Sequence, residues 1–243
     1  MDFKNQNVII VGASSGIGLA IAKLLYDKGA TVILVGRDSV KLKNSLQKIK
    51  KADDERIRII SADMTKEEDR ELIISSTNVL DHLIVTAANL TYSPIKDYSY
   101  ESIIQAVQSK IIAPFFLTQK AMNILRSSGS ITFISGIAAE RPMVGGVVTG
   151  TVNGALNSMV RGLAVELAPI RVNAISPGWI DTPIWEMIMN EEQKIEKFDA
   201  MKEKIPVRRI GKPEDVAQLV VSTISNGFIS GSVLYVDGGQ RII

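Results

Sequence analysis

The sequence has 243 residues, of which 46% are hydrophobic and 22% are charged, and its formal net charge is +2. This composition suits one globular domain, and acidic and basic residues alternate without a basic block, which argues against a nucleic-acid partner. The chain has no cysteine and one histidine, so disulfides and thiolate catalysis are excluded and no metal site is expected.

The beginning of the sequence shows no signal-peptide pattern, and no apolar run reaches the ~18 residues of a membrane span. We therefore expect a cytoplasmic protein whose partner is a small-molecule substrate and which does not attach to a membrane.

Short apolar runs alternate with helical patterns along the chain. Val8–Val11 is such a run, ends at a glycine, and is typical of a strand buried on both faces. Further strands are expected at residues 31–35, 56–60, 81–86, 130–134, 171–175 and 233–236. Helices are predicted at residues 17–27, 38–50, 66–76, 100–125 and 149–167. This alternation predicts an α/β fold in which helices cover both faces of a parallel sheet.

Two segments modify this pattern. Pro114 is expected to kink the helix at 100–125. The segment 181–204 is charged, helical in pattern and rich in methionine, and it follows a strand end, so we expect it to form a lid over a site. No linker or repeat divides the chain, and residues 1–243 are therefore predicted to form a single domain.

A glycine-rich turn, Gly12–Gly18, follows the first predicted strand and opens the first helix. Gly12 permits a tight turn, Gly16 lets the backbone approach a pyrophosphate, and Gly18 lets helix and strand pack closely. The helix N-terminus adds free N–H groups and a favourable dipole for phosphates. The turn therefore predicts a dinucleotide site.

The spacing G-x-x-x-G-x-G of this turn resembles that of the short-chain dehydrogenase/reductase superfamily. Four further segments are similar to family motifs: Ala62–Thr65, Arg171–Gly178, Gly211–Ala217 and Val236–Gly239. The resemblance covers essentially the whole chain. It implies a Rossmann-type doubly wound sheet of seven strands in the order 3-2-1-4-5-6-7. It also implies a homo-oligomer, a tetramer or a dimer, with subunits paired through the long predicted helices.

The resemblance further implies which residues bind a nicotinamide dinucleotide, with the segment after the third strand on the adenine side. The implied residues are Gly12, Ser14, Ser15, Gly16, Ile17, Gly18, Arg37, Asp63, Met64, Ala87, Ala88, Pro177, Gly178, Ile180 and Thr182.

The end of the second strand bears on the choice of dinucleotide. An NAD enzyme usually places an acid there to bind the ribose 2′-hydroxyl, but this position is Gly36. Arg37 follows, and a guanidinium can bind a 2′-phosphate through two hydrogen bonds. We therefore expect NADP(H) to be preferred over NAD(H); the alternative is that Arg37 is a solvated surface residue.

The catalytic positions depart from the family pattern of tyrosine, lysine, serine and asparagine. Aligned with that pattern in this order, the chain has Thr149, Asn153, Gly136 and Lys110. Lys110 and Asn153 thus exchange the family's residue types, and Lys110 is a candidate for holding a ribose hydroxyl or polarising a carbonyl, unless it is a surface lysine. Ser135 is a candidate for orienting the substrate. The candidate catalytic residues are therefore Lys110, Ser135, Thr149 and Asn153.

One literal Y-x-x-x-K occurs at Tyr92 and Lys96. It contains Pro94 and lies in a predicted loop, where residues four apart do not share a helix face, so we do not assign it as the family motif. Tyr92 is nevertheless a candidate for lining the substrate pocket.

Three functions remain open at this point. The first is an NADP(H)-linked oxidoreductase with a non-standard centre, acting on a small, apolar carbonyl, alcohol or quinone. Loss of a general acid slows such a reaction by ~10²–10⁴-fold, but the hydride chemistry belongs to the cofactor. The second is a catalytically silent NADP(H)-binding sensor or regulator. The third is a structural subunit that uses the fold for assembly.

Overall fold

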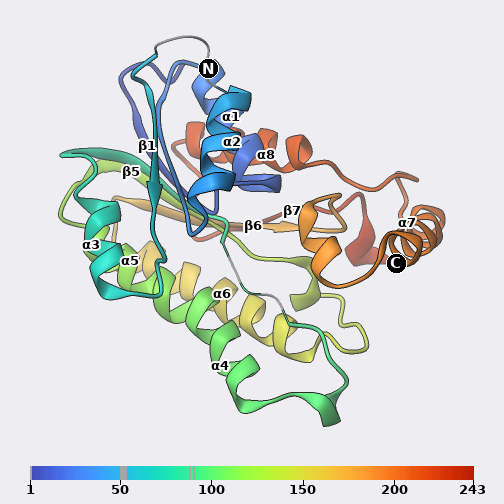
Figure 1. Cartoon of the computed structure of the whole chain (residues 1–243). Helices are drawn as coiled ribbons and strands as arrows, with labels where there is room; N and C mark the ends of the chain where they lie inside the picture. Colours follow the sequence, from blue (N-terminus) through green and yellow to red (C-terminus); the bar gives the residue numbers. More distant parts are fainter. Residues whose placement is uncertain (1, 50–53, 88, 90) are drawn as a thin grey trace.

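The computed structural model of the chain describes residues 2–49, 54–87, 89 and 91–243. Its seven parallel strands form one sheet in the order β3-β2-β1-β4-β5-β6-β7, which confirms the predicted Rossmann-type topology (Figure 1). The strands are β1 (Asn7–Val11), β2 (Thr31–Gly36), β3 (Ile57–Ser61), β4 (Leu80–Val85), β5 (Leu125–Ile134), β6 (Arg171–Pro177) and β7 (Val233–Val236).

Helices connect successive strands and lie on both faces of the sheet. The α-helices are α1 (Gly16–Asp27), α2 (Ser39–Ile49), α3 (Glu67–Ile74), α4 (Tyr100–Val107), α5 (Ala113–Ala121), α6 (Val147–Glu166), α7 (Glu191–Lys204) and α8 (Pro213–Ser225). The shorter helical turns are η1 (Ile95–Asp97), η2 (Gln108–Ile112), η3 (Ile137–Ala139), η4 (Pro183–Met187) and η5 (Gln240–Ile242).

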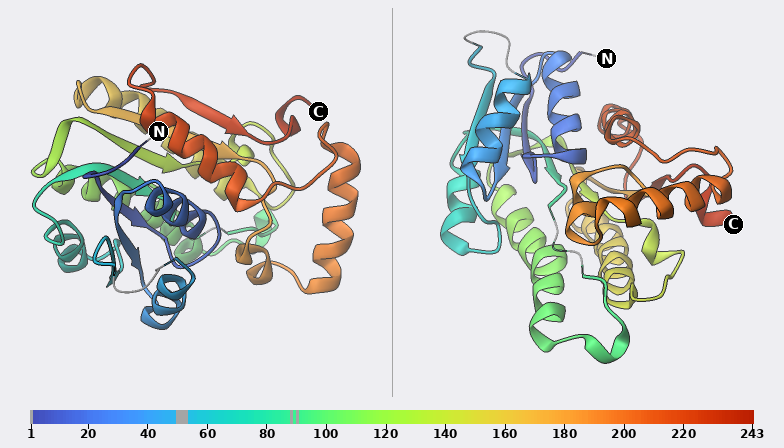
Figure 2. Two further views of the ribbon diagram at one scale, coloured as in Figure 1. Left: turned by 90° about the horizontal axis from the view of Figure 1, so that it is seen from above. Right: turned by 45° about the vertical axis from the view of Figure 1, so that its right-hand side comes forward.

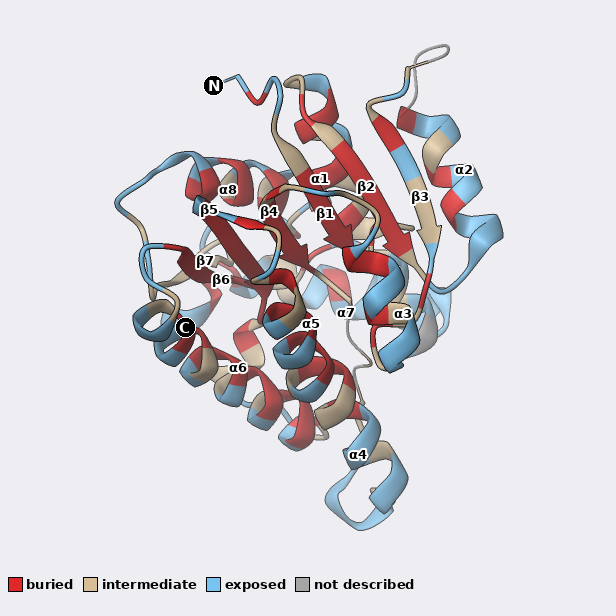
Figure 3. Cartoon of the chain, turned by 90° about the vertical axis from the view of Figure 1, so that its left-hand side faces the viewer, coloured by how far each residue is buried: buried red, intermediate tan, exposed pale blue. Residues whose placement is uncertain are grey.

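Two apolar cores lie on opposite faces of the sheet. On one face, α1, α2 and α8 pack through residues such as Ile21, Leu42 and Val220. On the other, α3, α5 and α6 pack through residues such as Ile73 and Leu117. Figure 3 shows the central strands buried and the outer surfaces of the helices exposed. Helices on both faces explain why the strands read as continuous apolar runs.

The predicted helix at 100–125 ends too late, and it contains a π-helical turn that was not predicted. The structure divides it into α4, the π-helical turn η2 and α5, and β5 already begins at Leu125. Pro114 lies in the first turn of α5 and has no N–H to donate to the carbonyl of Lys110, and the wider turn directly precedes it. Pro114 therefore lies just after a change of helix type within this helical segment.

Other differences are smaller. Helix α8 is not among the predicted helices, although Pro213 in its first turn and the hydrogen bond from the Lys212 N–H to Asp215 Oδ2 (2.8 Å) are usual signs of a helix start. The predicted end of the helix at 38–50, Lys50, lies outside the described residues.

The order of the strands reverses between β1 and β4, since β2 and β3 lie on one side of β1 and the later strands lie beyond β4. In doubly wound sheets, ligands bind outside the carboxyl ends of the strands at such a point. Figure 2 shows α7, in orange, near the C-terminus and apart from the helices that cover the sheet. No helix in the described part of the chain has both the length and the apolar character needed to cross a bilayer.

Candidate functional site

The turn between β1 and α1 requires its glycines. Gly12 and Gly16 have φ values of +91° and +52°, in the left-handed region that favours glycine. A Cβ at Gly18 would lie 2.2 Å from the carbonyl oxygen of Gly12. Ser15, the N-cap of α1, makes no side-chain capping bond, and the first helical turn has no acidic residue. The turn thus leaves a helix N-terminus uncapped by side chains, as an anion site requires.

The loop after β6 lies over this turn. A Cβ at Gly16 would meet Cβ and Cγ2 of Thr182 at 3.3 Å. Ile180 is 5% exposed and forms a β-bridge with Gly211, which fixes the loop. Ile17, Ile180 and Thr182 line one common cavity. The predicted pyrophosphate and carboxamide positions are therefore brought together.

The end of β6 is equally crowded. A Cβ at Gly178 would lie 2.8 Å from both Asp237 Cα and Gln240 Oε1, so a side chain has no room there. Gln240 Oε1 also accepts a hydrogen bond from the Trp179 N–H at 3.2 Å. Pro177 and Gly178 both line the cavity. Gln240 was not predicted as a site residue, because a glutamine near the end of a chain carries no motif of its own.

The segment after β3 is held by its own side chains. Asp63 Oδ1 accepts hydrogen bonds from the N–H and hydroxyl of Thr65, at 3.0 and 2.8 Å. Met64 is buried, and its carbonyl oxygen accepts a hydrogen bond from Arg70 Nη1 at 2.8 Å. These bonds leave Asp63 Oδ2 with no hydrogen bond to a described residue.

Two charged residues, Arg37 and Asp38, follow the end of β2 and have different surroundings. Asp38 Oδ1 accepts hydrogen bonds from the N–H groups of Val40 and Lys41 at 2.9 and 3.0 Å, and so caps α2. Arg37 is exposed, and its guanidinium has no ion-pair partner among the residues that the structure describes. The acid is therefore engaged in the helix cap and the arginine is available.

The end of β4 is tied to the glycine turn. The Thr86 hydroxyl donates to the carbonyl oxygens of Val11 and Gly12, at 3.0 and 3.2 Å. The Ala87 N–H donates to the Val11 carbonyl oxygen at 3.2 Å. Ala88, the other residue predicted here, lies outside the described residues.

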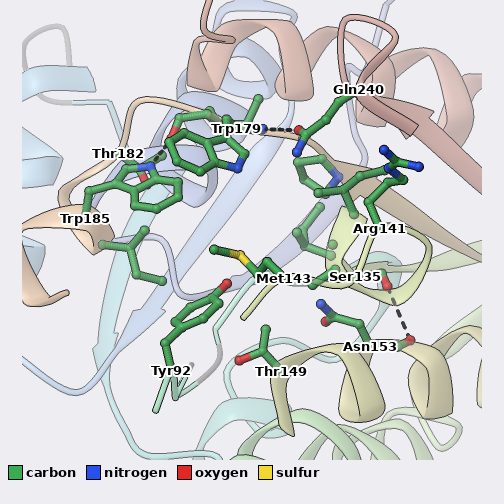
Figure 4. A pocket seen from close by; sticks show the side chains of 18 of the residues that line it. Tyr92, Ser135, Arg141, Met143, Thr149, Asn153, Trp179, Thr182, Trp185 and Gln240 are labelled. Atoms are coloured by element: carbon green, nitrogen blue, oxygen red, sulfur yellow. Dashed lines mark hydrogen bonds between the residues drawn. The ribbon is translucent and has the colours of Figure 1, made fainter. Parts of the chain in front are cut away.

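A cavity of about 610 Å³ opens beyond the carboxyl ends of β5 and β6, within the range of small-molecule sites. Its lining is mostly apolar, and its charged side chains are cationic: Lys110, Arg141 and Lys204. The cavity reaches Ile17 of the glycine turn and is lined by all four candidate catalytic residues, which are Lys110, Ser135, Thr149 and Asn153. Figure 4 shows Ser135, Thr149 and Asn153 in this lining.

The segment 181–204, which the sequence predicts to be a lid, forms one wall of this cavity. It consists of η4 and α7, and Ile184, Trp185 and Met201 line the cavity. The Trp179 and Trp185 rings lie 4.6 Å apart and both pack against Phe198. Trp185 Nε1 donates to the Ile180 carbonyl oxygen at 2.7 Å. This aromatic cluster anchors the wall to the end of β6.

Lys110 is 4% exposed, so the alternative of a surface lysine is wrong. Its ammonium donates to the Ile134 carbonyl oxygen at 2.7 Å and lies 3.4 Å from that of Ser135. Burial lowers the pKa of Lys110 to about 8. The π-helical turn η2 thus places the Lys110 ammonium at the end of β5, where Lys110 lines the cavity.

Asn153 is 2% exposed and lies against Gly136, where an added Cβ would be 2.8 Å from Asn153 Nδ2. Asn153 Oδ1 is buried and has no hydrogen-bond partner within the described chain. A buried amide oxygen without a partner is costly. A hydroxyl donor from a ligand in the cavity would satisfy it.

The two candidate hydroxyls are already engaged with the protein. Ser135 Oγ donates to Asn157 Oδ1 at 2.7 Å, toward α6. Thr149, which is 1% exposed, donates to the Thr91 carbonyl oxygen at 2.7 Å. Both side chains line the cavity, but their protons point to protein acceptors.

Tyr92 lines the cavity from the loop after β4, and its hydroxyl points toward the interior near Thr149 and Met143 (Figure 4). Burial raises the pKa of Tyr92, and a hydrogen bond with the Thr149 side chain partly offsets this effect. Arg141 and Lys204 were not predicted, since only the folded chain brings these two cations to one cavity.

The whole chain matches known proteins. A family model described as enoyl-(acyl carrier protein) reductase matches residues 12–241. The short-chain dehydrogenase/reductase malC from Malbranchea aurantiaca is 30% identical over 98% of this chain and 96% of its own length. The solved structure of the MalC reductase/Diels-Alderase from that organism superimposes with a TM-score of 0.92 at 27% identity, over 99% of this chain and 98% of that one.

Two further likenesses concern a reductase and a cofactor complex. The 3-oxoacyl-[acyl-carrier-protein] reductase FabG from Rickettsia prowazekii is 32% identical, and the match covers both chains completely. A small-chain dehydrogenase solved in complex with NADPH has a TM-score of 0.83 at 26% identity, over 98% of this chain and 99% of that one. With its sheet, glycine turn and cavity, the chain belongs to the short-chain dehydrogenase/reductase superfamily of oxidoreductases.

Proposed function

We propose that this protein is an NADP(H)-dependent oxidoreductase that acts on a small, largely apolar carbonyl, alcohol or quinone. The observation that carries the proposal is one mostly apolar cavity that is lined by Ile17 of the glycine turn, by Lys110 and by Asn153. A protein that used the fold only for assembly would not require this cavity. The cationic side chains of the lining favour neutral or anionic substrates over cationic ones.

The chain's own residues fit the dinucleotide. The turn Gly12–Gly18 would hold the pyrophosphate, with Thr182 above it, and Asp63 Oδ2 would accept a hydrogen bond from the adenine amino group. Asn153 Oδ1, which is buried and unpartnered, would accept one from a ribose hydroxyl. When bound, the nicotinamide supplies the hydride.

The four candidate catalytic residues take different parts in this proposal. Lys110 supports the floor of the site and adds positive potential near a developing oxyanion. Asn153 and Lys110 carry the amide and ammonium that the family places in the opposite positions. Ser135 and Thr149 position α6 and the loop at Thr91 through their hydrogen bonds.

The preference for NADP(H) is proposed from the end of β2. Gly36 offers no carboxylate to a ribose 2′-hydroxyl, and Asp38 is engaged in capping α2. Arg37 is exposed and available to a 2′-phosphate, which its planar guanidinium can bind through two hydrogen bonds.

The second candidate is an NADP(H)-binding sensor without turnover. It is favoured by one observation, that the hydroxyls of Ser135 and Thr149 donate to protein oxygens rather than into the cavity. Calorimetry cannot separate the two functions, but a screen for NADPH oxidation with carbonyl and quinone acceptors does.

The first experiment is calorimetric titration with NADPH, NADH and their oxidised forms. We expect micromolar binding that favours the phosphorylated forms. Arg37→Ala should weaken NADPH binding by about tenfold or more, the size of a lost charge-assisted hydrogen bond, and leave NADH binding almost unchanged.

Arg58→Ala is the matched control, because Arg58 is an exposed arginine of the neighbouring strand β3. Equal loss of NADPH and NADH affinity in Arg37→Ala would refute the assignment of the 2′-phosphate. Absence of binding by all four forms would refute both the oxidoreductase and the sensor.

A further inference from the structure

The loop that carries Tyr92 is fixed on both sides. The Ser93 N–H donates to the Gly145 carbonyl oxygen at 2.9 Å, and the Tyr98 hydroxyl donates to the same oxygen at 2.7 Å. Before Tyr92, the Thr149 hydroxyl donates to the Thr91 carbonyl oxygen at 2.7 Å. The backbone of Tyr92 is therefore held against the start of α6 rather than left free above the cavity.

The Tyr92 side chain extends from this fixed backbone into the cavity. Figure 4 shows its hydroxyl between Met143 and Thr149, on the side of the cavity where Asn153 also projects. Thr149 is the residue aligned with the family's tyrosine, and Tyr92 and Thr149 line the same side of the cavity. A phenol from a different segment thus lies next to the position where the family places its own.

The two other hydroxyls at this end of the cavity donate to protein acceptors. Ser135 donates to Asn157 and Thr149 donates to Thr91. A substrate oxygen in the cavity would have to compete with these bonds to obtain a proton from either hydroxyl. The Lys110 ammonium contacts the Ile134 and Ser135 carbonyl oxygens, and its third N–H can donate a hydrogen bond to the substrate oxygen beside Tyr92.

We propose that the Tyr92 phenol is the general acid of this site and protonates the substrate oxygen, and that it is supplied from the loop after β4 instead of from α6. The inference rests on the proposed oxidoreductase function. The carbonyl carbon accepts a hydride from the reduced nicotinamide, and the π electrons of the C=O bond move to oxygen. That oxygen takes the proton as the O–H bond of Tyr92 breaks, and the phenolate regains a proton from water.

The environment of Tyr92 gives the proton transfer a direction. Burial raises the pKa of the phenol, so Tyr92 is protonated at neutral pH. An alkoxide is a far stronger base than a phenolate, and transfer from Tyr92 to a reduced ketone is therefore downhill. Alcohol oxidation needs the phenolate as base, so we expect the protein to favour reduction at neutral pH.

The test compares two acceptors in wild type and Tyr92→Phe. Reduction of an unactivated ketone, from a panel of cyclic and aryl ketones, forms a strongly basic alkoxide, whereas reduction of 9,10-phenanthrenequinone forms a weakly basic oxyanion. We expect Tyr92→Phe to lower kcat for the ketone by ~10²–10⁴-fold, the usual contribution of a general acid. Its kcat for the quinone should change less than about threefold. A distorted pocket would lower both rates.

Tyr100→Phe is the control, because Tyr100 is an exposed tyrosine on α4, 74% exposed. Equal rates in wild type and Tyr92→Phe, or an equal loss with both acceptors, would overturn the role of Tyr92. So would a wild-type protein that reduces the quinone but no ketone, although it would leave the oxidoreductase function intact. Binding of NADPH without oxidation by any acceptor would refute the function itself, and with it this inference.

A second measurement does not depend on turnover. Ultraviolet titration of wild type minus Tyr92→Phe isolates the ionisation of this phenol. We expect its pKa to lie above the ordinary tyrosine value in the free protein and to fall when NADP⁺ is added, because the oxidised nicotinamide ring is cationic. A pKa of Tyr92 that NADP⁺ leaves unchanged would show that the phenol lies too far from the reacting atoms.

Discussion

His82 is the only histidine of the chain and lies in the interior of β4. Its Nδ1 lies 2.8 Å from Ser130 Oγ and its Nε2 lies 3.0 Å from Gln6 Oε1. Burial lowers the pKa of His82 to about 4, and the charge of Arg171 contributes in the same direction. The imidazole is therefore neutral at physiological pH and serves packing and hydrogen bonding.

This pKa predicts acid sensitivity. Between pH 6.5 and 4 the unfolded chain binds a proton at His82 that the folded protein does not bind, so stability falls as the pH falls through this window. The contribution is roughly 3 kcal/mol. We expect His82→Gln to lose less free energy of unfolding than wild type between pH 7 and pH 4.5, measured by urea denaturation. Parallel losses in the two proteins would contradict the prediction.

For the candidate catalytic residues, the sequence predicts some properties and not others. The alignment with the family predicts that Lys110, Thr149 and Asn153 lie close together, and in the structure all three line one cavity. The burial of Lys110 does not follow from the pattern, because it depends on the π-helical turn η2, which turns this residue toward β5. Asn153 Oδ1 is buried without a hydrogen-bond partner in the described chain, and this too is visible only after folding.

At the scale of elements, one aromatic side chain lies at the centre of the packing of the predicted lid. Phe198 of α7 is 7% exposed and contacts both Trp179 and Trp185, with ring centroids 5.9 and 5.6 Å away. Truncating a buried phenylalanine typically costs about 3–5 kcal/mol. We expect Phe198→Ala to loosen α7 locally and to accelerate tryptic cleavage after its lysines several-fold, as measured by limited proteolysis and mass spectrometry.

Phe228→Ala is the matched control for the lid, because Phe228 is fully exposed in the loop after α8. Its cleavage pattern should equal that of wild type. If α7 of Phe198→Ala is cleaved no faster than in wild type, another contact holds the lid, such as the ion pair between Lys194 and Asp181 at 2.9 Å.

Elements differed in how well the sequence predicted them. The strands were predicted within a few residues, except for the early start of β5, because apolar runs buried on both faces leave a clear signal. The division of 100–125 could not be predicted, since a π-helical turn keeps the apolar spacing of the helices around it. Helix α8 was missed although Pro213 and Asp215 mark its beginning.

At the scale of the whole molecule, apolar side chains remain exposed on α4 and α5, a surface that we expect to form subunit contacts. Ile104, Phe115 and Phe116 are 43%, 44% and 41% exposed. Large apolar surface of this kind commonly marks an interface. We expect wild type to be a dimer or tetramer in sedimentation analysis, and Phe116→Glu to shift it toward the monomer because the charge would be buried.

Phe228→Glu adds the same charge on an exposed loop and should leave the mass unchanged. A monomeric wild type, or a Phe116→Glu variant with unchanged mass, would show that this surface does not pair subunits. The topology of the molecule followed from the alternating pattern and the family motifs, but the surface that each helix leaves uncovered depends on how the helices pack.

The contact between Gly136 and Asn153 limits how this site can be redesigned. Gly136 has φ 171°, an extended conformation open to any residue, so the obstacle to a serine there is the amide 2.8 Å from its Cβ and not the backbone. The order in which the family's catalytic residues are introduced therefore matters, because a serine at position 136 requires the Asn153 amide to shift or to be replaced. Restoring the serine first would crowd the amide, and the two substitutions would be epistatic rather than additive.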